Sequence, residues 1–150
     1  ERGLIRSIGV SNFLPEHLKR LEEETGVLPV VNQIELNPYF NQAEQRSVDT
    51  KKGIITQAWS PLGRASSVLE EPILLEIAHA HHRTVAQIIL RWMVQSDILP
   101  IPKSSHSERQ ATNLDVFSFE LTPEEIALVD QLHRPTGRRE GMHPSLHQEF

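Results

Sequence analysis

Apolar and polar positions follow two rhythms along this chain. Four short runs rich in apolar residues are expected to be β-strands, and between them apolar residues recur at helical spacing. The runs span residues 4–10, 28–36, 54–59 and 98–102. Because strand and helix signals alternate at intervals of about 25 to 45 residues, the pattern predicts parallel βα units.

Local signals mark the expected helix boundaries. Proline stands where two helices should begin, at Pro15 and Pro72, and glycine where two should end, at Gly26 and Gly53. Capping-box pairs, in which a short polar residue precedes Glu or Gln by three places, predict further helix starts. These pairs are Asn41 with Glu44, Thr84 with Gln87, Ser105 with Glu108, and Thr122 with Glu125, whose helix should end near His133.

Two α/β architectures fit this alternation, a doubly wound sheet and part of a (βα)8 barrel. No GxGxxG motif follows any expected strand, so the dinucleotide fingerprint of a doubly wound fold is absent. The side chains at the strand ends are instead polar or aromatic, and barrels collect their chemistry on that face. They are Ser11, Asn12, Gln33, Trp59, Ser60, Lys103 and Ser104.

The stretch from residue 98 to 113 combines the features that hold a phosphate. Lys103, Ser104 and Ser105 follow the strand, and Arg109 falls in the first turns of the next helix. Backbone N–H groups at a helix start favour an anion, and the two cations add charge-assisted hydrogen bonds. A solvated loop is an equally good interpretation of this stretch alone.

The other strand ends favour the phosphate interpretation. Asn12 and Gln33 offer amides to an amide-bearing ring, and Trp59 offers a surface on which that ring can stack. A phosphate held beyond the fourth strand and a ring held at the first three together indicate a nucleotide site.

Composition narrows the class of protein. The 150 residues fit one domain, 38% of them are hydrophobic, and the formal charge of −5 without a basic run argues against a nucleic-acid partner. There is no cysteine, which excludes disulfides and thiol chemistry. No apolar stretch approaches the roughly 18 residues of a membrane span, and no signal peptide is visible, so we expect no membrane partner and a cytoplasmic location.

Four motifs in order resemble the C-terminal half of the aldo-keto reductase family. They are GVSNF at residues 9–13, VNQIELNP at 31–38, WSPLG at 59–63 and IPKSS with ERQATN between 101 and 113. The tail, with Gly137-Arg138 and His143-Pro144, is similar to the bacterial 2,5-diketo-gluconate reductase branch. The resemblance implies the last four βα units of a (βα)8 TIM barrel at residues 1–133 and a tail at 134–150 that forms the last loop over the substrate.

The resemblance also implies an NADPH-dependent enzyme that reduces a small carbonyl substrate, possibly a keto-sugar acid, and is a monomer at full length. The nicotinamide carboxamide would be held by Ser11, Asn12 and Gln33, and its ring would stack on Trp59. The pyrophosphate would lie along Ser60, Pro61, Leu62 and Gly63. The 2′-phosphate would be held by Lys103, Ser104 and Arg109 at the helix start that Ser105 caps, with Thr112 and Asn113 beside the adenine.

Some positions depart from the family's pattern. Thr112 stands where Glu or Gln is usual, and Gln110 where an aliphatic residue is usual. The family's catalytic Asp, Tyr, Lys and His belong to the first four units, and Tyr39 does not match the family's acid, so no catalytic residue is predicted and the span is expected to be inactive alone. The rival hypothesis is a non-catalytic half-barrel that binds nucleotide weakly or not at all.

Several other side chains could in principle bind a metal or support a site. No metal site is predicted, because His79, His81 and His82 suit a helix C-terminus as cations and Pro144 breaks the helical pairing of the two tail histidines. The two histidines of the tail are His143 and His147. Trp92 is expected in the core, and Glu35 is left unassigned as polar support at the barrel mouth.

Overall fold

Four parallel strands form one sheet in the order β1-β2-β3-β4, as expected from the sequence. The computed structural model describes residues 3–64, 67–139 and 143–145. The strands are β1 (Gly9–Ser11), β2 (Val31–Glu35), β3 (Ile55–Trp59) and β4 (Ile98–Pro100). The helices are α1 (Pro15–Thr25), α2 (Ala43–Lys51), the 3-10 helix η1 (Ser67–Glu70), α3 (Pro72–His81), α4 (Val85–Gln95), α5 (Ser107–Leu114) and α6 (Pro123–Asp130).

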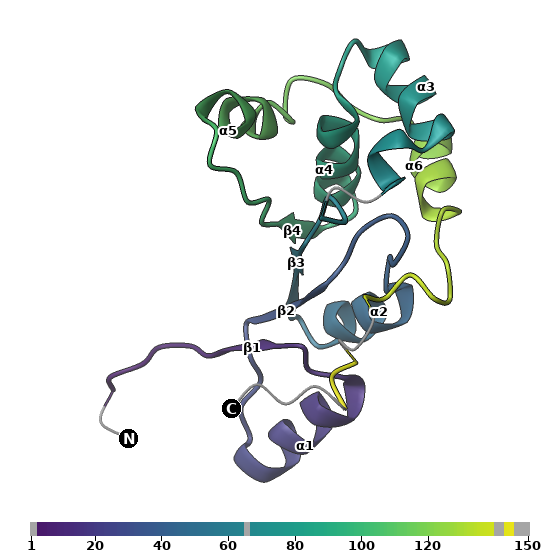
Figure 1. Ribbon diagram of the computed structural model, residues 1–150. Coiled ribbons are helices and arrows are strands. Elements are labelled where there is room, and N and C mark those ends of the chain that lie inside the picture. The colour runs from purple at the N-terminus through teal and green to yellow at the C-terminus, as the bar shows by residue number, and fades with distance from the viewer. Residues whose placement is uncertain (1–2, 65–66, 140–142, 146–150) are drawn as a thin grey trace.

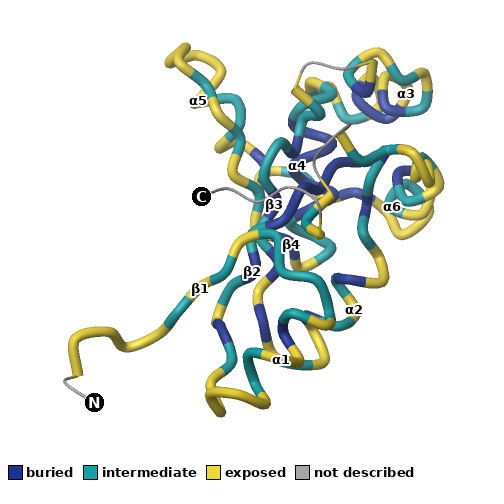
Figure 2. The backbone as a smooth tube through the Cα atoms, turned by 60° about the horizontal axis from the view of Figure 1, so that its bottom comes forward, coloured by how far each residue is buried: buried dark blue, intermediate teal, exposed yellow. Residues whose placement is uncertain are grey.

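The two faces of the sheet differ in what covers them. On one face α2 packs against β3 and α4 against β4, and Asn32, Ile34 and Ala58 are buried there. The opposite face carries Ile55, 53% exposed, and Leu99, 49% exposed. Figures 1 and 2 show the helices gathered to one side of the strands, while α5 stands apart beyond β4. The sheet is therefore open, with β1 and β4 as its edges.

The core lies between the sheet and helices α3, α4 and α6. Trp92 on α4 has no exposed surface, and its indole N–H donates to Asp130 Oδ1 at 3.2 Å. Leu74 and Ile77 of α3 and Val129 of α6 belong to the same cluster. The expectation that Trp92 is a core residue is confirmed.

Most helix boundaries follow the local signals. Pro15 and Pro72 begin α1 and α3, and Gly26 ends α1 with a left-handed φ of 68°, which glycine adopts at little cost. Both halves of a capping box are present at Thr84 with Gln87 and at Thr122 with Glu125. These start signals are therefore confirmed.

Two expected caps are wrong, each by one residue. The N-cap of α5 is His106, not Ser105, because Ser104 Oγ accepts the His106 N–H at 3.1 Å and delays the first helical turn. The N-cap of α2 is Gln42, while Asn41 Oδ1 instead accepts the Ala43 N–H at 3.3 Å. The capping-box rule identified both helices but misplaced their first residues.

The strands are shorter than the apolar runs that predicted them. Residues 4–7 are exposed and lie outside β1, which pairs with β2 only over Gly9–Ser11. A strand needs a partner along its length, and β2 begins only at Val31. In the part of the chain that the structure describes, no helix has the length and apolarity needed to cross a membrane.

Candidate cofactor-binding site

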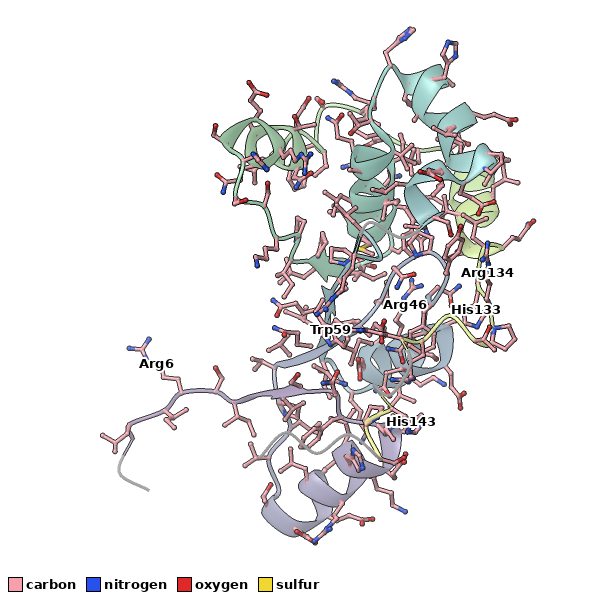
Figure 3. The ribbon with its side chains drawn as sticks, in the orientation of Figure 1. Arg6, Arg46, Trp59, His133, Arg134 and His143 are labelled. Carbon is pink, nitrogen blue, oxygen red and sulfur yellow. The ribbon has the colours of Figure 1, made fainter. Side chains whose placement is uncertain are left out.

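Asn12 and Trp59, 47 residues apart, meet at the carboxyl ends of β1 and β3. Trp59 Nε1 donates to Asn12 Oδ1 at 3.0 Å, which ties the indole to the residue after β1. Figure 3 labels Trp59 among the side chains of the sheet. Asn12 has a left-handed φ of 58°, and its backbone N–H donates to the Gln33 carbonyl at 2.9 Å. Ser11 Oγ donates to the same carbonyl at 3.4 Å. The chain thus turns out of β1 with the Asn12 amide held beside the indole ring.

Gln33 lies in the same cluster and is oriented by a neighbour. Its Nε2 donates to Gln57 Oε1 at 2.6 Å, and the two residues are register partners in β2 and β3. With Nε2 engaged, Gln33 presents its amide oxygen as an acceptor. Sequence reasoning missed Gln57, although strand alternation places it on the same face of β3 as Trp59.

A buried polar network supports this cluster from the helix-covered side of the sheet. Asn32 accepts the Phe13 N–H at 3.3 Å and donates to the Phe13 carbonyl at 3.0 Å, so it clamps the residue after Asn12. Asn32 also donates to Asp49 Oδ1 at 3.4 Å. Burial raises the pKa of the Asp49 carboxyl, while its side-chain hydrogen bonds oppose that rise. Asp49 thereby links α2 to the loop that carries Asn12.

The turn after β3 forms one wall of a cavity of about 380 Å³. Ser60 has a left-handed φ of 51°, and its carbonyl accepts the Gly63 N–H at 2.9 Å. Between them Pro61 is buried, and Leu62 packs against the hydrophobic core. Ser60 and Gly63 line the cavity together with three arginines and the Glu35 carboxylate, so the cations outnumber the anion and the lining suits an anionic group. The arginines are Arg64, Arg134 and Arg139.

The expected phosphate residues lie in a second group, after β4 and on α5. Lys103, Ser105 and Arg109 are exposed, while Ser104, Thr112 and Asn113 are partly buried. Gln110 Nε2 donates to the Ser104 carbonyl at 2.8 Å and so ties the loop to the helix. The hydrogen bonds of the described residues do not join this group to Asn12 and Trp59. Figure 1 shows α5 beyond β4, at the far edge of the sheet from β1.

Glu35, which the sequence left without a role, receives the C-terminal segment at the end of β2. The side chain is only 4% exposed, and both of its carboxylate oxygens accept the Arg139 backbone N–H, at 3.2 and 3.3 Å. Burial raises the Glu35 pKa, opposed by that N–H and by the charges of Arg138, Arg139 and Arg64. The only feature of the sequence that pointed to this contact was the pair of consecutive arginines after Gly137.

The other candidate side chains that the structure describes contact neighbouring side chains. His81 Nε2 lies 2.9 Å from Glu125 Oε1 and joins α3 to α6, and the His79 and His82 rings are 6.4 Å apart. The Tyr39 hydroxyl donates to Glu71 Oε2 at 2.5 Å. His147 lies outside the described residues.

A parallel sheet with helices on one face and its polar groups at the carboxyl ends of the strands defines a class, the βα proteins that bind ligands at that end. Comparison with known proteins identifies the family within the class. The model of the Aldo/keto reductase family matches residues 1–134, so the chain belongs to this family, and the resemblance noted in the sequence is confirmed.

Similar proteins share both sequence and fold with the chain. An aldo-keto reductase of Mycolicibacterium smegmatis is 51% identical over 96% of this chain and 51% of its own length. The 2,5-diketo-D-gluconic acid reductase B of a Corynebacterium species is 48% identical over 100% of this chain and 53% of its own length. The chain therefore spans about half the length of the curated relatives it matches.

Solved structures give the same result. A Gox0644 mutant in complex with NADPH superposes with a TM-score of 0.91 at 45% identity, over 95% of this chain and 52% of that one. A Bombyx mori aldo-keto reductase in complex with NADP gives a TM-score of 0.82 at 37% identity, over 91% and 47%. Because such relatives are TIM barrels, the prediction of half a (βα)8 barrel is confirmed at the level of the fold.

Proposed function

We propose that this chain is the NADPH-binding half of a carbonyl reductase that converts an aldehyde or ketone to an alcohol. The observation that carries the proposal is the hydrogen-bonded cluster of Asn12, Gln33 and Trp59 at the carboxyl end of the sheet. Amide groups beside an indole face suit a nicotinamide carboxamide and its ring. The NADPH complex of a 45% identical protein supports the choice of cofactor.

In this proposal each group of residues holds one part of the cofactor. The carboxamide lies at Ser11, Asn12 and Gln33, and the ring lies on Trp59. The pyrophosphate runs along residues 60–63, and the 2′-phosphate and adenine lie at the residues after β4. These last are Lys103, Ser104, Ser105, Arg109, Thr112 and Asn113. The chain's own residues would orient the nicotinamide ring and neutralise the phosphates of bound NADPH, which would supply a hydride to the carbonyl carbon.

The proton donor lies outside this chain in our proposal. Tyr39 is the single tyrosine, and its hydroxyl is bonded to Glu71 beside η1. We propose that the complete catalytic set requires four further βα units, that residues 1–133 form the half-barrel and 134–150 the tail over the substrate, and that the full-length protein is a monomer. The reductase from Corynebacterium supports a keto-sugar acid as the substrate class.

The test is a comparison of NADPH with NADH in the full-length protein. Arg109 is exposed and so accessible to the 2′-phosphate that NADH lacks. A hydrogen bond to a charged group contributes about 1.5–3 kcal/mol, so Arg109→Ala should weaken NADPH binding by roughly tenfold to a hundredfold. NADH binding should stay within about twofold, as should both affinities in the control Arg20→Ala on α1.

The outcomes separate the hypotheses. A loss confined to NADPH supports the 2′-phosphate assignment. Equal losses for both cofactors would refute it, and a protein that binds neither cofactor would favour the non-catalytic half-barrel.

A further inference from the structure

The segment Arg134–Arg139 lies against the β2–α2 loop and forms part of the wall of the 380 Å³ cavity. We call this segment the strap. Figure 1 shows the chain leaving α6 and running past α2. The Arg134 N–H donates to the Tyr39 carbonyl at 2.9 Å, and the Gly137 N–H closes a turn onto the Arg134 carbonyl at 2.9 Å. Arg134 and Arg139 of the strap line the cavity together with Ser60 and Gly63.

Aromatic rings of the loop hold the two ends of the strap. The Arg134 guanidinium carbon lies 3.6 Å from the centre of the Tyr39 ring, and Arg134 Nη2 donates to Glu71 Oε2 at 3.3 Å. The Arg138 guanidinium carbon lies 4.6 Å from the centre of the Phe40 ring. Contacts of this kind are attractive, and they strengthen where water is excluded.

One close approach fixes the strap's path between these contacts. A Cβ on Gly137 would lie 1.9 Å from the Tyr39 carbonyl oxygen, so only glycine fits without displacing the strap. The strap's last described residue, Arg139, then donates its backbone N–H to both oxygens of Glu35. A carboxylate is a stronger acceptor than a neutral group, so this contact holds the end of the strap, as the ion pair of Arg134 with Glu71 holds its beginning.

We propose that Glu35 is a positioning residue that anchors the strap, and that the anchored strap completes an arginine-lined wall for the cofactor's diphosphate. The inference rests on the proposed function for the identity of the ligand and on geometry alone for the anchor. Glu35 does not touch the diphosphate in this proposal. It acts through Arg139 and the strap, so its removal changes where the arginines lie.

The sign of one measurement separates positioning from simple electrostatics. Glu35→Gln removes a negative charge near an anion site, which by charge alone strengthens binding of NADPH and NADH. Release of the strap instead weakens both cofactors equally, because the diphosphate is common to them. We expect both affinities of the full-length protein to fall on the order of tenfold, in contrast to the NADPH-specific loss expected for Arg109→Ala.

A cofactor-free measurement tests the anchor by itself. Trypsin cleavage after Arg138 and Arg139, quantified by mass spectrometry against cleavage after Lys103 in the same digest, should rise on the order of tenfold in Glu35→Gln. Gly137→Ala should likewise speed cleavage of the strap and weaken binding of both cofactors. Because it does not alter a buried residue, it keeps the test valid if Glu35→Gln folds poorly. Glu44→Gln, an exposed carboxylate in the first turn of α2, is the control.

Each outcome has one meaning. Faster strap cleavage with weaker binding of both cofactors supports the proposal. Unchanged cleavage in both variants, or tighter binding in Glu35→Gln, would overturn it. Faster cleavage in a protein that binds neither cofactor would support the role of Glu35 as an anchor. It would refute both the proposed function and the diphosphate wall.

Discussion

Asp49 has no exposed surface and accepts hydrogen bonds from Gln45 at 2.9 Å, Thr56 at 3.0 Å and Asn32 at 3.4 Å. Its pKa in the folded protein lies above the ordinary value of 3.8, with burial as the largest cause. The folded state therefore binds this proton at a higher pH than the unfolded chain does. By linkage, its contribution to stability is fully present below 3.8 and is lost as pH rises through the raised pKa.

Asp49→Asn should remove this pH dependence. The free energy of unfolding from urea titrations, plotted as wild type minus variant, should fall as pH rises from the ordinary carboxyl value through the raised one. Glu35 also has a raised pKa, but it is present in both proteins and cancels in the difference. A difference in the free energy of unfolding that stays constant with pH would contradict a raised pKa of Asp49 in the folded protein.

Trp59 is the residue whose optical signal reports the proposed site. Since its indole lies beside Asn12 at the strand ends, NADPH should quench tryptophan fluorescence of the full-length protein, and Trp59→Phe should remove most of the quench. Trp92, fully buried in the core, is the matched control. If Trp92→Phe abolished the quench and Trp59→Phe left it intact, the nicotinamide would lie elsewhere.

At the scale of elements, the starts of α4 and α5 can be compared. One residue caps its helix, and the other only matches the capping pattern in the sequence. Thr84 Oγ1 accepts the Gln87 N–H at 3.2 Å, and Gln87 Oε1 accepts the Thr84 N–H at 3.0 Å. Ser105 occupies an equivalent place in the sequence pattern, yet α5 begins after His106. Sequence spacing alone does not distinguish them, because the choice depends on which hydroxyl reaches the first unpaired N–H groups.

Thr84→Ala should therefore destabilise the protein by about 1 kcal/mol, the usual effect of losing an N-cap. Ser105→Ala should change the free energy of unfolding by less than about 0.5 kcal/mol. Urea midpoints at constant m-value measure both changes. Equal losses would mean that Ser105 is the functional cap of α5 after all.

At the scale of the whole molecule, the described residues form a sheet with two edges and one face that no described helix covers. The edge strands β1 and β4 each have one partner strand, and Ile55, Leu99 and Ile101 are exposed. Unpaired strand edges and apolar surface favour association with another chain.

Expressed by itself, the 150-residue chain should self-associate or remain partly molten, which light scattering after size exclusion and near-UV circular dichroism would measure. It should show no turnover with NADPH and aldehydes. Carbonyl reduction by a pure monomer of this chain would contradict our proposals that the proton donor lies outside it and that further βα units are required.

The sequence by itself determined the order of strands and helices, the parallel sheet and the family, because these depend on periodicity, proline and glycine signals, and motifs that are local in the chain. It also singled out Asn12, Gln33 and Trp59, since polar residues at strand ends are visible in one dimension. Only the tertiary structure decided that Trp59 bonds to Asn12, that Gln57 orients Gln33, and that Glu35 holds Arg139 from 104 residues away. Such pairings depend on strand register and on how the chain returns to the sheet, which no local pattern encodes.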